Sequence, residues 1–305
     1  MGKRELVILG AGPAGLTAAI YARRSDLDVL VVEKGLAGGQ IRITAEIENW
    51  PGLVNSTGVG LADSFRRHAE HFNTEFLTAE IKGLRLEGDR KVVTTSAGDI
   101  EAEAVIVATG ASFRRLGCPG EDRFIGCGVS FCAVCDAEFF VDEIVAVVGG
   151  GNTAVEEAIY LTRFAKKVYI IHRRDEFRAD PLVRRRAAGN EKLVPVLDSV
   201  VTSIEGEDLV ERVLVQNVKT GATTPLEVAG VFMFVGTQPH TDFLGGLLER
   251  SEGGWLATDR RLATSVPGIF AAGDVRDTPL RQVVTAAADG ALAAMSAYHY
   301  LENQR

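Results

Sequence analysis

The chain has 305 residues, 46% of them apolar, which suffices for about two domains with a sizeable core. Its 33 Lys and Arg against 41 Asp and Glu give a net charge of −8, which argues against a nucleic-acid partner because binding a phosphate backbone requires a basic face. No stretch approaches about 18 uninterrupted apolar residues, so no membrane span is expected. The short apolar run near the start has no cleavage signal after it, and the expected setting is the cytoplasm, where thiols are kept reduced.

Two stretches far apart in the chain predict the same βαβ unit. The first has a strand, a glycine-rich turn, a helix and a second strand at residues 5–9, 10–15, 13–24 and 29–33. The second has the same order at residues 144–148, 149–151, 153–164 and 167–172. Each is the beginning of a dinucleotide-binding fold, so the sequence predicts two nucleotide sites.

The remaining elements suggest that one domain is inserted into the other. Hairpins are expected around Gly88 and Gly221, further apolar strands at 105–108, 231–235 and 269–272, and a final helix at 281–301. The segments 115–120 and 237–246 are rich in Gly, Pro and polar residues, as expected where a chain crosses between domains. The predicted fold is therefore α/β with two Rossmann-like domains, one formed by residues 1–115 and 245–305 and the other, residues 116–244, inserted into it.

The first nucleotide motif is Gly10-Ala11-Gly12-Pro13-Ala14-Gly15, which matches G-x-G-x-x-G between a strand and a helix. Glycines at these places let backbone N–H groups approach a pyrophosphate at the helix N-terminus. Glu33 ends the next strand, where a carboxylate can accept hydrogen bonds from an adenosine ribose. Without this context the motif would be an ordinary tight turn.

The second motif is Gly149-Gly150-Gly151-Asn152-Thr153-Ala154, and the strand after it ends in cations instead of an acid. The segment 172–178 contains His172, Arg173, Arg174 and Arg178. Arginines bind a 2′-phosphate through charge-assisted hydrogen bonds, whereas a carboxylate would repel it. The motif therefore predicts an NADPH site, the alternative being a solvated basic loop.

Cys132-Ala133-Val134-Cys135 has the C-x-x-C spacing of a small reversible disulfide. A zinc site would need two further ligands nearby, and Cys118 and Cys127 lack a second paired spacing, so no metal is expected. Asp136 follows directly and could exchange a proton with a thiolate, or serve only as a turn or cap residue. Gly273-Asp274 follows a short apolar strand and could place a carboxylate on a polyol chain.

Together these motifs resemble the low-molecular-weight thioredoxin reductases, flavoproteins with two dinucleotide-binding domains. The resemblance covers essentially the whole chain and also includes Gly38-Gly39-Gln40, residues 48–52, Ala108-Thr109-Gly110 and Arg281-Gln282-Val283. It implies that FAD occupies the first nucleotide site and NADPH the second. It also implies a homodimer that reduces thioredoxin or a thioredoxin-like protein.

The resemblance assigns roles to individual residues. Cys135 would face the flavin, Cys132 would attack the partner disulfide, and Asp136 would be the acid/base. FAD would be held by Gly10, Gly12, Pro13, Ala14, Gly15, Glu33, Lys34, Gly39, Gln40, Asn49, Thr109, Gly110, Gly273, Asp274, Arg281, Gln282 and Val283. NADPH would be held by Gly149, Gly151, Asn152, Thr153, Ala154, His172, Arg173, Arg174 and Arg178. Glu138 departs from the family pattern, since an aromatic residue often stands there and contacts the partner.

The predicted function is a relay in which electrons pass from NADPH through FAD and the Cys132–Cys135 disulfide to the partner protein. Three alternatives are a flavin-dependent oxidase of small dithiols that uses oxygen, a reductase of ferredoxin- or flavodoxin-like carriers, and a non-catalytic redox sensor that holds nucleotide. The arginine-rich segment disfavours the oxidase, the C-x-x-C disfavours the carrier reductase, and two complete nucleotide motifs beside that C-x-x-C favour electron transfer over sensing.

Overall fold

The computed structural model describes residues 2–44, 46–54 and 56–305 and divides the chain into two compact units. Unit 1 consists of Met1–Ser112 and Gln238–Arg305, and unit 2 is Phe113–Thr237. The sequence places the bounds of the inserted domain at 116 and 244, and the structure divides the chain at 113 and 237. The two crossing segments, β9 (Ala111–Phe113) and β18 (Thr237–Pro239), pair with each other as a two-stranded sheet.

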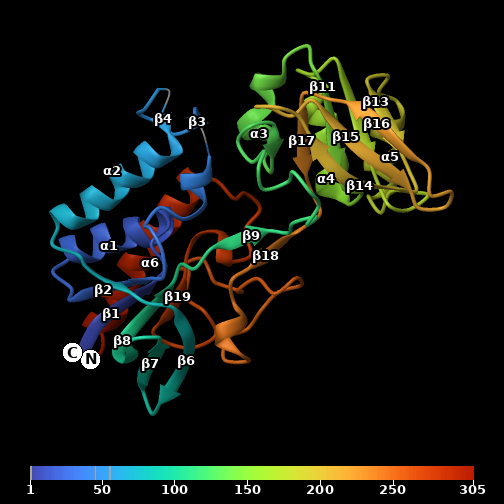
Figure 1. Ribbon diagram of the computed structural model, residues 1–305. Coiled ribbons are helices and arrows are strands. Elements are labelled where there is room, and N and C mark those ends of the chain that lie inside the picture. The colour runs from blue at the N-terminus through green and yellow to red at the C-terminus, as the bar shows by residue number, and fades with distance from the viewer. Residues whose placement is uncertain (1, 45, 55) are drawn as a thin grey trace. The chain divides into compact units, whose positions relative to one another are not determined.

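Unit 1 is built on a seven-stranded sheet in the order β5-β2-β1-β8-β7-β6, with β19 also paired to β8 (Figure 1). Strands β5, β2, β1, β8 and β19 are parallel, whereas β6, β7 and the first half of β8 form an antiparallel meander. The strand bounds are β1 Lys3–Leu9, β2 Val29–Glu33, β5 Glu75–Thr78, β6 Ile81–Glu87, β7 Arg90–Thr95, β8 Gly98–Val107 and β19 Ile269–Ala271. A separate pair is formed by β3 (Glu46–Ile47) and β4 (Ser56–Thr57).

Three helices cover one face of this sheet, namely α1 (Pro13–Arg24), α2 (Gly58–His71) and α6 (Val283–Glu302). Alternate residues of β1 divide between the two faces: Leu6 and Ile8 pack with the helices, and Val7 and Leu9 pack on the opposite side. Burial on both faces explains why β1 is a continuous apolar run. Short 3-10 helices occur at Gly39–Ile43, Asp242–Leu244 and Gly273–Val275.

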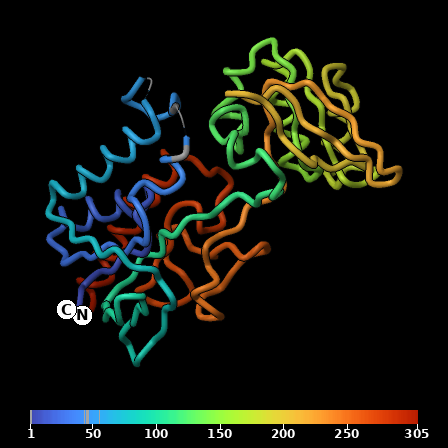
Figure 2. Tube along the Cα trace, viewed as in Figure 1, coloured from blue at the N-terminus to red at the C-terminus, as the bar shows by residue number. Residues whose placement is uncertain are grey.

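Helices α1 and α6 pack very closely. A Cβ on Gly290 would lie 2.1 Å from the carbonyl oxygen of Ala14, so only glycine fits in α6 at this position. The end of the chain also returns to its beginning in unit 1, because Arg305 forms an ion pair with Glu5 of β1, and Figure 2 shows the C-terminal end of α6 near the start of β1. Tight packing of α6 on α1 places the start of α6 near the first glycine motif.

Unit 2 has a five-stranded parallel sheet in the order β10-β17-β11-β12-β13. These strands are β10 Val129–Ser130, β17 Gly230–Met233, β11 Ile144–Val148, β12 Lys167–Ile171 and β13 Leu193–Val196. Helices α3 (Ala133–Asp136) and α4 (Asn152–Leu161) share one core cluster with this sheet, together with the 3-10 helix Ala137–Phe140, and α5 (Pro181–Ala188) packs on α4. The other face packs against an antiparallel sheet of β14 (Ser199–Glu205), β15 (Arg212–Asn217) and β16 (Thr223–Glu227).

The predicted fold class, α/β with two Rossmann-like domains, is confirmed. The sequence predicts α1, β2 and β11 with the bounds that the structure has, whereas α6 begins at Val283 instead of Arg281. Gln282 is the N-cap of α6 and forms a capping box with Thr285, which fixes the first helical residue. Over the part of the chain that the structure describes, no helix is both long and apolar enough to cross a lipid bilayer.

Candidate functional site

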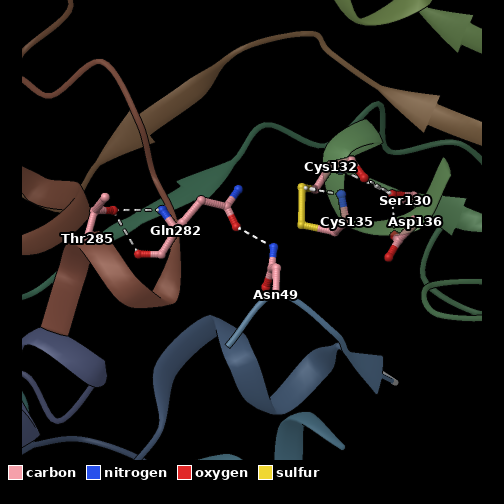
Figure 3. The surroundings of a disulfide bond; sticks show 7 residues. All are labelled: Asn49, Ser130, Cys132, Cys135, Asp136, Gln282 and Thr285. Carbon is pink, nitrogen blue, oxygen red and sulfur yellow. Dashed lines mark hydrogen bonds between the residues drawn. A yellow bond between two sulfur atoms is a disulfide. The ribbon is translucent and has the colours of Figure 1, made fainter. Parts of the chain in front are cut away.

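The two cysteines of the C-x-x-C are joined as a disulfide at the start of α3, with a Cα–Cα distance of 5.3 Å (Figure 3). Cys132 is the N-cap of this helix, and the backbone N–H of Cys135 donates to its Sγ at 3.2 Å. Both residues are half-buried. Because an N–H group aimed at sulfur favours the thiolate, this geometry suits Cys132 as the nucleophile once the bond is reduced.

Asp136 ends α3 and is held beside the disulfide by Ser130. The Ser130 hydroxyl donates to Asp136 Oδ2 at 2.5 Å and accepts the backbone N–H of Cys132 at 3.1 Å. Burial raises the pKa of Asp136 above its ordinary value, and the hydrogen bond from Ser130 opposes that shift in part. A carboxyl group with a raised pKa can carry a proton for the dithiol at a higher pH than a surface aspartate can.

The first glycine motif, in unit 1, combines two sterically required glycines with one open position. A Cβ on Gly15 would lie 1.9 Å from the Gly10 carbonyl oxygen, and Gly10 itself has φ +103°. A Cβ on Gly12 would meet no atom of the protein within 4 Å. Gly12 is also the N-cap of α1 and supplies no capping side chain, so the N–H groups of Ala14 and Gly15 in the first turn have no side-chain cap. This cradle fits a pyrophosphate.

Glu33 links the end of β2 to that motif. Its Oε2 accepts the N–H of Ala11 at 3.0 Å, and its Oε1 accepts the N–H of Gly35 at 3.0 Å. Each carboxylate oxygen has a further lone pair, which is what an adenosine ribose requires. Lys34 is exposed beside it.

Several predicted flavin residues gather around the first motif in unit 1. A Cβ on Gly39 would lie 3.3 Å from Gly12 Cα, and the Gln40 amide donates to the Ala111 carbonyl. The Thr109 hydroxyl donates to the His240 carbonyl at 2.8 Å, and the Gly110 carbonyl accepts the His240 N–H at 3.0 Å. These bonds fix the loop that follows β8.

The start of α6 is joined to a second loop of unit 1. Asn49 Nδ2 donates to Gln282 Oε1 at 3.1 Å, and the backbone N–H of Gln282 donates to the Thr285 hydroxyl at 3.1 Å (Figure 3). The structure thus brings Asn49 and Gln282 together although they are far apart in the sequence. Val283 is the first residue of the helix.

Asp274 lies in the turn after β19, which is held by a half-buried ion pair that the sequence did not predict. Asp289, on α6, accepts from Arg276 Nε at 2.6 Å and from the Gly273 N–H at 3.0 Å. A second bond joins Arg276 to the other oxygen of Asp289 at 3.0 Å. The only sequence signal for Asp289 is an acid in an otherwise alanine-rich helix. Asp289 therefore orients the turn in which Asp274 stands.

Burial raises the pKa of Asp274 to about 6, and the nearby Arg281 opposes the shift. The guanidinium of Arg281 lies 3.7 Å from the centre of the Trp255 ring, and burial lowers its pKa. Its Nε is buried and has no hydrogen-bond partner among the described residues. The buried Arg281 donor and the nearby, half-buried Asp274 carboxyl group fit a ligand that both accepts and donates hydrogen bonds, as a ribityl chain does.

The raised pKa of Asp274 predicts how the flavin-stripped protein responds to pH. A carboxyl group whose folded pKa lies above its ordinary value of 3.8 gives its full contribution to stability below that value and loses it as pH rises through about 6. Asp274→Asn should therefore raise the free energy of unfolding by up to about 3 kcal/mol near pH 8, and the gain should shrink between about pH 6 and pH 4. Urea denaturation at several pH values measures this. The exposed neighbour variant Asp277→Asn is the control, and an equal gain at every pH would contradict the assignment.

The second glycine motif, in unit 2, repeats the design of the first. A Cβ on Gly149, which has φ +152°, would lie 2.5 Å from the Phe234 carbonyl oxygen and 2.7 Å from Ala154 Cβ. A Cβ on Gly151 would meet nothing within 4 Å, and Gly151 caps α4 without a side chain. The N–H groups of the first turn of α4, around Thr153, therefore also have no side-chain cap. This cradle fits a second pyrophosphate.

The cations after β12 are free to bind an anion. Arg173, Arg174 and Arg178 are exposed, and none of them forms an ion pair with any residue that the structure describes. His172 is buried beneath Gly150, where a Cβ would lie 2.3 Å from its Nδ1, and its Nε2 has no partner among the described residues. Burial lowers the pKa of His172, and the three arginines lower it further.

The side chain of Asn152, a predicted NADPH residue, is hydrogen-bonded to Asp180 and does not lie in an open ligand site. Its Nδ2 donates to Asp180 Oδ2 at 2.8 Å, and its Oδ1 accepts the Asp180 N–H at 2.7 Å. The sequence gives no signal for this role of Asp180, because an aspartate before Pro181 at the start of α5 is typical of a helix cap. The residues that the structure describes bring together no group of three or more His, Cys, Asp or Glu that could hold a metal ion. Cys118 and Cys127 are free thiols, and burial raises the pKa of Cys118.

Comparison with known proteins places this geometry in context. Residues 4–290 match the family model described as pyridine nucleotide-disulphide oxidoreductase. The chain is 44% identical to a thioredoxin reductase of Peptoclostridium acidaminophilum over 305 residues, covering 98% of this chain and 97% of the relative. It is 42% identical to a thioredoxin reductase of Bacillus subtilis (strain 168), covering 98% of this chain and 95% of the relative. A solved thioredoxin reductase from Streptococcus pyogenes MGAS5005 is 48% identical, with a TM-score of 0.95 and 99% of each chain covered.

Proposed function

Because the chain belongs to the pyridine nucleotide-disulphide oxidoreductase family, and within it to the thioredoxin reductases, we propose that FAD binds in unit 1, NADPH in unit 2, and the partner disulfide at Cys132. The enzyme is an NADPH-dependent thioredoxin-disulfide reductase that uses FAD. The observation that carries the assignment of sites is the Cys132–Cys135 disulfide in a chain with two open glycine cradles. Only the cradle of unit 2 is followed by unpaired arginines, which is why NADPH is placed there.

The residues around the two cradles divide the binding. In unit 1, Glu33 would take the ribose, Gly12 and the first turn of α1 the pyrophosphate, and Asp274 the ribityl hydroxyls. In unit 2, Gly151 and the first turn of α4 would take the pyrophosphate and the three arginines the 2′-phosphate. Bound FAD supplies two-electron transfer between a nicotinamide and a disulfide.

The cysteines and Asp136 then perform the thiol chemistry. Two electrons and a proton break the Cys132–Cys135 bond and leave a thiolate and a thiol. The Cys132 thiolate attacks one sulfur of the partner disulfide, forms a mixed disulfide and releases the other partner sulfur as a thiolate. Cys135 attacks Cys132, which restores the internal bond and releases the reduced partner. Asp136 would deliver a proton to the first departing partner thiolate and then take the proton from the Cys135 thiol as Cys135 attacks, which returns Asp136 to its protonated state.

The partner in this proposal is thioredoxin or a thioredoxin-like protein, consistent with the names of the relatives. We further propose that the enzyme is a homodimer and acts in the cytoplasm. Free thiols such as those of Cys118 and Cys127 persist in a reducing compartment, in a protein that also has a redox-active disulfide.

Turnover of the purified enzyme tests this proposal. With NADPH, thioredoxins encoded by the same genome should be reduced, and the absorbance of bound FAD should bleach on anaerobic addition of NADPH. NADH should support much slower turnover because it lacks the 2′-phosphate. Oxygen consumption with small dithiols, in the absence of NADPH turnover, would favour the oxidase instead. A protein that cannot be loaded with FAD would refute the relay.

A further inference from the structure

The glycine loop of unit 2 is hydrogen-bonded to the end of the arginine segment at two positions. Asn152 and Asp180 exchange two hydrogen bonds, at 2.8 Å and 2.7 Å, between the first residue of α4 and the residue before α5. Two residues earlier in the segment, the Arg178 N–H donates to the Gly150 carbonyl at 2.7 Å. Gly150 also lies directly over the ring of His172. The segment 172–180, which bears the arginines, is therefore fixed to the loop before α4.

Asp180 uses its side chain for this link and not to cap its own helix. An aspartate at an N-cap commonly accepts an N–H from the second or third helical residue. Here Asp180 is the N-cap of α5, yet its side chain makes no capping hydrogen bond, and Oδ2 accepts from Asn152 Nδ2. The stability of α5 alone does not explain the position of the carboxylate.

The negative charge of Asp180 is unexpected at a site that is proposed to bind the phosphates of NADPH. A carboxylate close to two phosphate-binding elements repels an anionic ligand, so its charge alone would weaken NADPH binding. Its two bonds to Asn152, in contrast, hold the arginine segment at a fixed distance from the N–H groups of α4. The electrostatic effect and the positioning effect thus have opposite signs, which allows an experiment to separate them.

We propose that Asp180 is a positioning residue for NADPH, which ties the arginine segment to the glycine loop so that the 2′-phosphate and the pyrophosphate are bound as one rigid pair. This inference rests on the proposed placement of NADPH in unit 2. Asp180 need not touch the nucleotide. It acts through Asn152 and through the direction that it gives to Arg178.

Three variants of the FAD-loaded enzyme test the proposal. Asp180→Ala removes the charge and the side-chain bond from Asn152 Nδ2, and leaves the bond from the Asp180 backbone N–H in place. Asp180→Asn removes the charge but keeps an acceptor for Asn152 Nδ2, and Asp175→Ala removes an equal charge from the same segment. Asp175 is exposed, and among the described residues its side chain forms an ion pair with Lys219 alone, at 3.9 Å, and no hydrogen bond with the glycine loop. Calorimetric Kd values for NADP⁺ and NAD⁺, together with KM and kcat for NADPH, are the readouts.

Asp180→Ala should weaken NADP⁺ binding and raise the KM for NADPH by about tenfold, the cost of losing a hydrogen bond to a charged group, with kcat nearly unchanged. Asp180→Asn should stay within about twofold of the parent enzyme, and Asp175→Ala should bind NADP⁺ equally or more tightly. The Kd for NAD⁺ should change less than that for NADP⁺ in Asp180→Ala.

Two results would overturn the proposal. One is an Asp180→Ala variant that binds NADP⁺ as tightly as Asp175→Ala does, and the other is an Asp180→Asn variant that loses as much affinity as Asp180→Ala. If the parent enzyme itself fails to bind NADP⁺, the placement of NADPH is wrong, and that failure is distinct from either result. Hydrogen exchange of residues 172–180 adds a readout that does not depend on ligand: exchange should be faster in Asp180→Ala than in Asp180→Asn, and equal rates would also contradict the role.

Discussion

Replacing Cys135 with serine is expected to abolish reduction of thioredoxin, by at least about a thousandfold, while bound FAD is still reduced by NADPH. The hydroxyl of serine cannot form the internal disulfide with Cys132, so electrons on the flavin have no sulfur acceptor in the chain. Cys132→Ser should lose turnover to the same extent, because the thiolate and not an alcohol is the nucleophile. Stopped-flow bleaching of the flavin absorbance and steady-state thioredoxin reduction measure the two halves separately.

Cys127 provides the matched control for these variants. It is a free, half-buried cysteine of unit 2, so Cys127→Ser changes the same chemical group away from the disulfide. Its turnover should stay close to that of the parent enzyme. Normal thioredoxin reduction by either Cys132→Ser or Cys135→Ser would show that the relay does not pass through this disulfide.

The elements of the fold that are determined by local sequence could be predicted. Helix α1 and strand β2 have the bounds that the apolar pattern and the glycine turn indicate, and β11 does as well. In these βαβ units the strand, the turn and the helix are set by local sequence, because each glycine serves the turn it stands in. The predicted cofactors, FAD and NADPH, are those of the family to which the chain belongs.

The contacts that orient the candidate site could not be predicted, because each joins residues that only the fold brings together. Asp289 holds the Gly273 turn across from α6, and Asn49 reaches Gln282 from a distant loop. Asp180 pairs with Asn152 between two helices. Helix α2 also escaped prediction, since its apolar residues are few and are buried only when the fold brings α1, the 3-10 helix Gly39–Ile43 and Trp50 against them.

The two nucleotide cradles differ in the residues that distinguish one coenzyme from the other. Both have an open glycine at the helix N-terminus, Gly12 in unit 1 and Gly151 in unit 2. Strand β2 ends in Glu33, whose carboxylate binds the loop N–H of Ala11, whereas β12 leads into His172 and the arginines. Both units therefore have the same kind of pyrophosphate cradle, and the residues at the end of the second strand of each unit distinguish the two ligands.

Removing all three arginines should largely abolish the preference for NADPH. In the variant with Arg173, Arg174 and Arg178 replaced by alanine, the ratio of kcat/KM for NADPH to that for NADH should fall by about two to three orders of magnitude. Each guanidinium is exposed and forms no ion pair among the described residues, so its charge is available for the 2′-phosphate. Turnover with NADH should change little, because NADH has no group at that position.

Arg163 provides the control for the triple arginine variant. Arg163→Ala removes a cation from the end of α4, where Arg163 lies against the Tyr160 ring, and it should leave the coenzyme ratio unchanged. A loss that is equal for NADPH and NADH would mean that the arginines support the fold or the pyrophosphate instead of the 2′-phosphate. Because exposed charges are screened, the parent enzyme's preference for NADPH should also decline as salt is raised, and the triple variant's ratio should not.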